Sequence, residues 1–323
     1  MAEILGIGCS HAPMILNPPE EWGNMRKSVY SRVPNYQAPD SMVQELGDDN
    51  GLSHDKKNQK RITDAFAVLR DKLHDWKPDV VIIVGDDQAE NFKRDNLPTF
   101  CLYTGSQVDG YPFHGALGKI NVWNAPQDTK YSYRCAGPLA QAMVAHTIRE
   151  GFDMASSTEL KGWEWGLGHA HINPLTFLDP EGKLTILPLF VNCYGEEAGE
   201  GYPPRPTAKR CYELGRSIRR FLDTRDERVA VVASSSWSHS FLTHKFNCSR
   251  FDDEFDRKNL ELLEKGQGSK IAELTPEQIQ QSGDHEFLNW LVPLGVLGDR
   301  SARIIDTLDE QSQISFKVFA IWD

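Results

Sequence analysis

The chain has 323 residues, a hydrophobic content of 40% and a charged content of 25%, which is typical of an ordinary globular protein. Its formal net charge of -11 argues against nucleic acid or an anionic membrane as the main partner, because either would require a basic face.

Short apolar runs predict strands buried on both faces. They cover residues 4–9, 80–84 and 229–233, and such runs are typical of a parallel sheet flanked by helices. Further strands are expected at 96–104, 184–191 and 314–322, and helices at 53–75, 136–150, 206–223, 251–264 and 286–297. We therefore predict an α/β fold: a single domain over 1–323 with a central, mostly parallel or mixed sheet, flanking helices and long active-site loops.

Two segments are predicted to be loops. Residues 14–57 are polar, contain prolines and look too irregular for a core element, so we predict a lid-like excursion. Residues 161–174 form a second loop, rich in Gly and Trp.

The cysteines and the amino terminus bear on the compartment. The six cysteines include no Cys-x-x-Cys pair, which favours a reducing compartment without structural zinc. The amino terminus has no signal-like pattern, and no apolar run reaches the length of a membrane span. We predict a cytoplasmic protein that does not act at a membrane.

Each of the three buried runs leads into a polar cluster. The clusters contain Ser10-His11, Asp86-Asp87-Gln88 and Ser238-His239. Because ligands gather beyond the carboxyl ends of parallel strands, these clusters predict one active site. Gly6-Ile7-Gly8 lacks the third glycine of a dinucleotide-binding loop, so we reject that site.

Four side chains in or near these segments could carry chemistry. His239 and His169 are candidates for proton transfer near neutral pH. His11 is either a ligand or a histidine satisfied by a backbone carbonyl. Glu254 falls at helical spacing with neighbouring apolar residues and is expected to point at the core, where a metal ion or an Arg partner would have to meet its charge.

The chain resembles the class III extradiol ring-cleaving dioxygenases, of the type formed by the catalytic β subunit of protocatechuate 4,5-dioxygenase. The resemblance spans nearly the whole chain. It rests on segments that match in the same order: Ser10-His11-Ala12-Pro13, Val80–Asp87, Gly168-His169 with Pro174-Leu175, Pro188-Leu189-Phe190-Val191-Asn192, the helix from Lys209 to Arg219, Trp237-Ser238-His239 and Glu254-Phe255-Asp256.

The resemblance implies an Fe(II) site held by two His and one Glu, with open positions for a catecholate and dioxygen. It implies that His11 and Glu254 bind the metal, that His239 is the acid/base and that His169 guides the substrate or protonates an intermediate. It also implies an oligomer of identical chains, with a small second subunit that caps the site in some relatives.

The sequence departs from the family at the second strand end, where Asp-His is replaced by Asp87-Gln88. Three interpretations remain open: Gln88 binds the metal weakly or through water, another His supplies the nitrogen, or the redox reaction is lost. His54 is the specific candidate for the second interpretation, because it would share one inward helix face with Asn58 and Ile62. We hypothesise that His11, His54 and Glu254 form the triad and that Gln88 contacts a ligand or the substrate.

These inferences predict Fe(II)-dependent extradiol cleavage of a catechol-, gallate- or aminophenol-type aromatic by dioxygen. The alternatives are a non-oxidative metal-dependent hydrolase or decarboxylase, or a binding homologue that lost the metal. Five loop aromatics are candidates to sandwich the planar ring: Trp163, Trp165, Tyr194, Tyr202 and Trp237.

Overall fold

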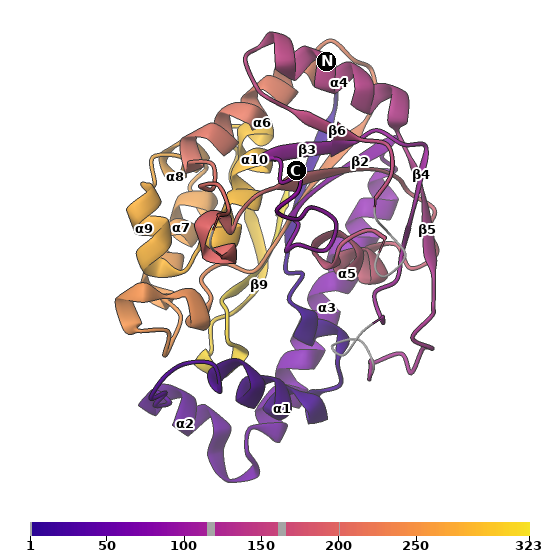
Figure 1. Ribbon diagram of the computed structural model, residues 1–323. Helices are drawn as coiled ribbons and strands as arrows, with labels where there is room; N and C mark the ends of the chain where they lie inside the picture. Colours follow the sequence, from indigo (N-terminus) through magenta and orange to yellow (C-terminus); the bar gives the residue numbers. More distant parts are fainter. Residues whose placement is uncertain (1, 115–119, 161–165, 200) are drawn as a thin grey trace.

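A computed structural model describes residues 2–114, 120–160, 166–199 and 201–323. Within these residues, ten strands form one mixed sheet (Figure 1). Its main path runs in the order β4-β5-β7-β2-β8-β1-β10-β9, and β3 and β6 branch from it at β7. The strands are β1 Ile4–Cys9, β2 Val80–Asp86, β3 Phe100–Tyr103, β4 Gln107–Gly110, β5 Tyr131–Cys135, β6 Ala155–Ser157, β7 Thr185–Val191, β8 Val229–Ser234, β9 Arg303–Leu308 and β10 Lys317–Trp322.

The centre of the sheet is parallel. β1 and β2 both pair with β8, and β2 pairs with β7 on its other side, all in parallel. β10 and β9 continue the sheet beyond β1 in antiparallel orientation. The carboxyl ends of β1, β2, β7 and β8 therefore meet at one edge.

Helices cover both faces of the sheet, as the buried apolar strands require. One face packs against α4 Gly137–Arg149, α6 Ala208–Leu222 and α10 Leu288–Leu297. The other packs against α3 Leu52–Trp76 and α5 His169–Leu178. Alternate residues of β2 supply the two cores, with Ile82 facing α6 and α10, and Ile83 facing α3 and α5. The predicted α/β class is confirmed.

Glycines in β1 let a helix approach the sheet closely. A Cβ atom on Gly8 would overlap the ring of Trp290, and one on Gly6 would overlap Leu297. Both neighbours belong to α10. The Gly6-Ile7-Gly8 sequence therefore serves helix packing, in line with the rejection of a dinucleotide loop.

The excursion after β1 is more ordered than its polar sequence predicts. It contains two 3-10 turns, η1 Pro13–Leu16 and η2 Gly47–Asp49, and two helices, α1 Pro19–Tyr30 and α2 Asp40–Leu46. Figure 1 draws α1 and α2 together at the lower end of the molecule. Whether this segment acts as a lid stays a prediction.

Most predicted elements occur close to their expected bounds, but several elements were missed. These include β4, β5, β6, β9, the short helix α8 Gly268–Ile271 and α9 Pro276–Ser282. Helix α5 begins inside the predicted loop 161–174. The remaining helix is α7 Asp253–Glu264, and the remaining 3-10 turns are η3 Gly195–Ala198, η4 Ser240–Leu242, η5 His244–Phe246, η6 His285–Phe287 and η7 Gln311–Gln313. None of the described helices is both long and apolar enough to cross a bilayer.

Candidate metal centre and its cavity

A cavity of about 320 Å³ lies where the parallel strands end. His11 follows β1, Gln88 follows β2, Tyr194 follows β7 and His239 follows β8, and all four line the cavity. His169, at the start of α5, lines it as well. The prediction that the strand-end clusters converge on one site agrees with this arrangement.

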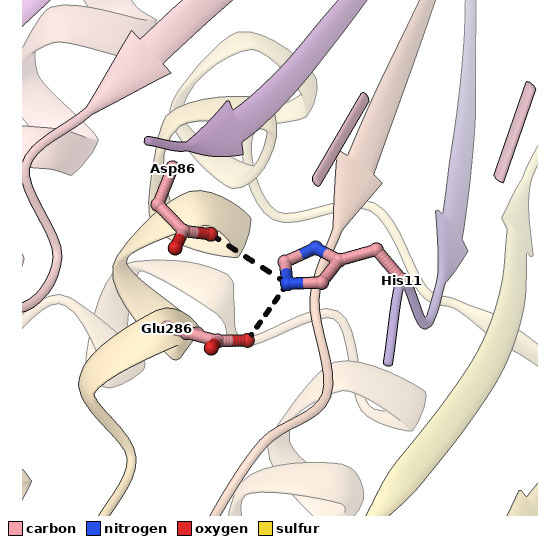
Figure 2. A group of neighbouring side chains, drawn as sticks. All are labelled: His11, Asp86 and Glu286. Atoms are coloured by element: carbon pink, nitrogen blue, oxygen red, sulfur yellow. Dashed lines mark ion pairs between the residues drawn. The ribbon is translucent and has the colours of Figure 1, made fainter. Parts of the chain in front are cut away.

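His11 presents an unsatisfied ring nitrogen to two buried carboxyl groups. Its Nδ1 lies 2.9 Å from the Ser234 carbonyl oxygen. A carbonyl only accepts, so Nδ1 donates and the lone pair of a neutral ring is at Nε2. This atom lies 3.1 Å from Oε2 of Glu286 and 3.7 Å from Oδ1 of Asp86 (Figure 2).

These three side chains fit a divalent cation. Nε2 of His11 and Oε2 of Glu286 are buried and have no hydrogen-bond partner among the residues that the structure describes. A lone pair facing a carboxylate oxygen is unfavourable unless a proton or a cation lies between them. Two ligands at right angles about a cation, each bonded at about 2.0–2.2 Å, are about 3 Å apart. His11, Asp86 and Glu286 also form a group of possible metal ligands whose donor atoms all lie within 4.8 Å of one another.

Neutral donors hold the two carboxyl groups in place. Gln88 Nε2 donates to Asp86 Oδ2 and to Glu286 Oε1, at 3.0 Å each. Tyr194 donates to Glu286 Oε1 at 2.6 Å, and Asn289 donates to Asp86 Oδ1 at 2.9 Å. Since carboxylates only accept, the nitrogen of the Gln88 amide must face them. Gln88 therefore positions both carboxyl groups.

The two carboxyl groups differ in acidity. Burial and the nearby charge of Glu286 raise the pKa of Asp86. Burial also opposes ionisation of Glu286, but His239, His11 and the Tyr194 hydrogen bond outweigh it and hold the pKa of Glu286 well below its usual range. Glu286 is thus ionised although it is buried away from water. An ionised carboxylate in such a place is stabilised by a positive charge close to it.

His239 and His169 flank this group with opposite acid–base character. His239 Nε2 lies 3.7 Å from Glu286 Oε2, and burial lowers the pKa of His239 although Glu286 opposes this. His169 Nδ1 lies 2.8 Å from Glu90. Burial disfavours the charged ring of His169, but Glu90, Asp86 and Glu286 outweigh it and raise its pKa to about 9. His239 can therefore accept a proton, whereas His169 already carries one.

The predicted inward position of Glu254 is wrong. Its side chain is 72% exposed and pairs with Lys258 at 3.0 Å on α7. A helical phase that includes Phe251 points Glu254 inward, but α7 begins at Asp253, after the N-cap Asp252, and Phe251 lies outside the helix. The buried face of α7 instead carries Asp256, Asn259 and Leu263.

His54 also lies away from the proposed metal ligands. It is in the first turn of α3, with its side chain 22% exposed, and its nearest ion-pair partner is Glu310 at 4.0 Å. Asn58 and Ile62 are buried as predicted. Asn58 bonds Arg61, which pairs with Asp306 and Glu310. The polar side of this face meets β9 and the segment after it, and His54 does not line the cavity.

Among the described loop aromatics that were predicted to sandwich the ring, Tyr194 lines the cavity. His171, two residues after the predicted His169, belongs to the core. His171 is fully buried and bonds the Leu189 carbonyl, and burial lowers its pKa to about 3, which fits a structural role. Trp237 is buried in the core against Trp290. Tyr202 is not among the cavity residues. Trp163 and Trp165 lie outside the described residues.

Three polar residues of the site were missed as site residues. Asp86 belongs to one of the predicted clusters but has no predicted role of its own, and Glu90 has no predicted role either. Glu286 lies in η6 just before α10, where Asp284-His285-Glu286 directly precedes a mostly apolar helix. A charged triplet leading into an entirely buried helix is the signal that could have identified Glu286.

Comparisons with known proteins identify the family of this chain. The family model described as "Catalytic LigB subunit of aromatic ring-opening dioxygenase" matches residues 46–317. A 2,3-dihydroxyphenylpropionate/2,3-dihydroxicinnamic acid 1,2-dioxygenase of Photorhabdus laumondii is 27% identical over 182 residues, which cover 56% of this chain and 49% of the relative. A second such enzyme, from Pseudomonas putida, is 28% identical over 192 residues, covering 58% of this chain and 53% of the relative.

The chain thus spans about half the length of the curated relatives it matches. A solved structure of an uncharacterized protein from Escherichia coli K12 is similar with a TM-score of 0.50 and 13% identity, covering 81% of this chain and 92% of that one. This likeness supports the fold alone. The family model covers most of the chain, and the chain belongs to the family of catalytic LigB subunits of aromatic ring-opening dioxygenases.

Proposed function

We propose that this protein uses dioxygen and Fe(II) to open an aromatic ring that bears adjacent hydroxyl groups, or a hydroxyl and an amino group. The observation that carries the proposal is the unsatisfied pair of His11 Nε2 and Glu286 Oε2 at the buried end of the cavity. In a chain of the LigB family, such a pair supports a metal centre for ring cleavage. The relatives named as dihydroxyphenylpropionate dioxygenases favour a catechol-type substrate.

The metal ligands in this proposal are His11, Glu286 and Asp86. Glu286 takes the role first given to Glu254, and Asp86 takes the third position first given to His54. This set has one imidazole and two carboxylates, so it is richer in oxygen than the usual two-His, one-carboxylate iron site. Gln88 replaces the second imidazole of the family, and its hydrogen bonds support a positioning role.

Bound Fe(II) would supply the Lewis acidity that lowers the pKa of the substrate hydroxyl, and open positions for the diol and dioxygen. The protein residues would then manage protons. His239, whose pKa is lowered by burial, accepts a proton from the substrate hydroxyl. His169, held by Glu90, keeps a proton that it can donate to an oxygen of the opening ring.

The proposal is tested by metal analysis combined with oxygen uptake. The protein is purified without oxygen, loaded with Fe(II) and supplied with catechols, gallate and 2-aminophenols. We expect about one bound metal per chain and consumption of dioxygen equal to the ring opened. Turnover without oxygen would instead support a non-oxidative metal enzyme on this scaffold. Absence of bound metal and of oxygen uptake on the whole panel would contradict the proposal.

A further inference from the structure

Asp256 is a buried carboxyl group that the proposed mechanism does not use. It belongs to Glu254-Phe255-Asp256, one of the segments that carry the family resemblance, and Glu254 of this segment lies on the surface. Asp256 itself is fully buried on the inward face of α7. A carboxyl group in such a place is unfavourable unless hydrogen bonds or a proton compensate. The contacts of Asp256 therefore indicate what this segment does.

Ser238 joins Asp256 to the proposed base of the mechanism. The Ser238 hydroxyl accepts a hydrogen bond from the backbone N–H of Asp252 at 3.1 Å, and it donates its single proton to Oδ2 of Asp256. Ser238 is itself buried, and His239 follows it directly in the chain. The hydrogen bond to Asp256 therefore helps to fix the backbone that carries His239.

Asp256 also makes a side-chain hydrogen bond with Asp284, a second fully buried acid. Two carboxylates only accept, so this bond requires a proton on one of them. Without that proton, Oδ1 of Asp256 and both carboxyl oxygens of Asp284 would have no donor among the residues that the structure describes. Burial and the charge of Asp284 raise the pKa of Asp256 well above its usual range, so Asp256 carries the proton. Asp256 is thus a neutral acid that accepts from Ser238 and donates to Asp284.

The two segments that Asp256 connects lie against each other and carry the proposed base and a proposed metal ligand. The backbone N–H of His239 donates to the Gly283 carbonyl oxygen at 3.1 Å. Asp284 precedes η6, and Glu286 lies two residues further on in this turn. At the cavity, His239 Nε2 and Glu286 Oε2 are 3.7 Å apart. Asp256 therefore bonds to both segments close to the residues that face the cavity.

Resting on the function proposed above, we propose that Asp256 is a positioning residue, which sets the spacing between His239 and Glu286 through its hydrogen bonds to Ser238 and Asp284. His239 must reach the hydroxyl of a substrate that lies at the Glu286 end of the cavity. A small displacement of either residue would slow the proton transfer, because this transfer depends on hydrogen-bond distance.

The test compares Asp256→Ala, which removes both hydrogen bonds, with Asp256→Asn, whose amide can accept from Ser238 and donate to Asp284. The control is Asn259→Ala, because Asn259 is buried on the same face of α7 and bonds the Phe255 carbonyl oxygen within the helix. Oxygen uptake with the Fe(II)-loaded protein measures kcat, and titration with Zn(II) measures metal affinity. Urea unfolding shows whether each variant is folded under the assay conditions.

We expect kcat of Asp256→Ala to fall about 100-fold, as a small misplacement in an active site can cause. Its Zn(II) affinity should fall about tenfold, as for residues that support a metal ligand. Asp256→Asn and Asn259→Ala should match the original chain. Unchanged kcat and Zn(II) affinity in a folded Asp256→Ala overturn the inference, and so does an Asp256→Asn that loses as much as Asp256→Ala.

Infrared spectra test the shared proton without turnover and without the alanine variant. At neutral pH the Zn(II)-loaded original chain should show the carbonyl band of a protonated carboxylic acid that is absent from Asp256→Asn. A difference spectrum without this band overturns the inference. If no diol is consumed, the dioxygenase proposal fails, but the band together with the loss of Zn(II) affinity in Asp256→Ala still supports the positioning role of Asp256.

Discussion

Glu286 has the most demanding environment of any single side chain in the site. Its Oε1 accepts hydrogen bonds from Tyr194 and Gln88, while Oε2 faces His11 and His239 and accepts no hydrogen bond from the described part of the chain. Burial of an ionised carboxylate is costly unless positive charge or several donors compensate. The surroundings of Glu286 therefore stabilise its negative charge and leave Oε2 free to bind a cation.

Replacing Glu286 tests the assignment of the metal ligands. Glu286→Ala should weaken metal binding by at least about 10–100-fold, because loss of a residue that merely supports a ligand already costs this much. Glu254→Ala is the matched control: its side chain lies on the surface and should leave metal affinity unchanged. Titration with Fe(II) or Zn(II) measures both. A large loss in the control with little change in Glu286→Ala would restore the original assignment of Glu254.

The effects of Gln88 and His54 on metal binding can be distinguished by the same measurement. Gln88→Ala removes the donor shared by Asp86 and Glu286, so we expect about 10–100-fold weaker metal binding. His54→Ala should have no effect on metal affinity, because His54 does not line the cavity. The hypothesis of a triad containing His54 predicts the opposite pattern, with loss in His54→Ala.

The sequence predicts the site residues that strand geometry controls. His11, Gln88 and His239 follow parallel strands, so their proximity follows from the sheet alone. Glu286 comes from a 3-10 turn after α9, and no strand end indicates where this turn lies. Glu254 was misplaced because helical phase depends on where α7 begins, and boundaries are the least certain part of a pattern.

At the scale of elements, α1 shows why a segment that is ordered in the structure can look irregular in the sequence. Its buried residues are Trp22, Arg26 and Tyr30, which are spaced four apart. The middle residue, Arg26, is charged, so the sequence does not show a continuous apolar stripe at helical spacing. It is tolerated because Arg26 makes a two-pronged contact with Asp55 of α3. The burial of Arg26 depends on Asp55, which belongs to another helix, so the sequence of α1 alone does not reveal its buried face.

Helices α6 and α10 pack through glycines. A Cβ atom on Gly215 would overlap the Val292 carbonyl oxygen, and one on Gly295 would overlap that of Tyr212. In both cases the overlap is with backbone, which cannot move aside as a flexible side chain can. Because Glu286 immediately precedes α10, the same packing also fixes the position of the proposed metal ligand.

Gly215→Ala should therefore lower the free energy of unfolding by roughly 1–3 kcal/mol, a typical cost of overpacking. Gly268→Ala is the control, because the nearest atom to its added Cβ is a Leu294 methyl at 3.5 Å. We expect the control to stay within about 0.5 kcal/mol of the original chain. Urea unfolding measures both variants. Equal stability of the two variants would show that α6 and α10 can separate without cost.

At the scale of the whole molecule, the proposed ligands join distant parts of the chain. His11 follows β1, Asp86 ends β2 and Glu286 precedes α10. In the unfolded chain these side chains are far apart and cannot hold one cation together. A metal that binds them binds the folded state preferentially and stabilises it by linkage.

Metal binding should thus raise the midpoint of thermal unfolding. At a free metal concentration of 100 times Kd the stabilisation is about 2.7 kcal/mol, which corresponds to roughly 5 °C for a chain of this size. Scanning calorimetry of the metal-free protein, with and without added Zn(II), measures the shift. Glu254→Ala should show the same shift, and Glu286→Ala should show little. A full shift in Glu286→Ala would mean that the cation binds elsewhere, because the site described here would have lost its ionised ligand.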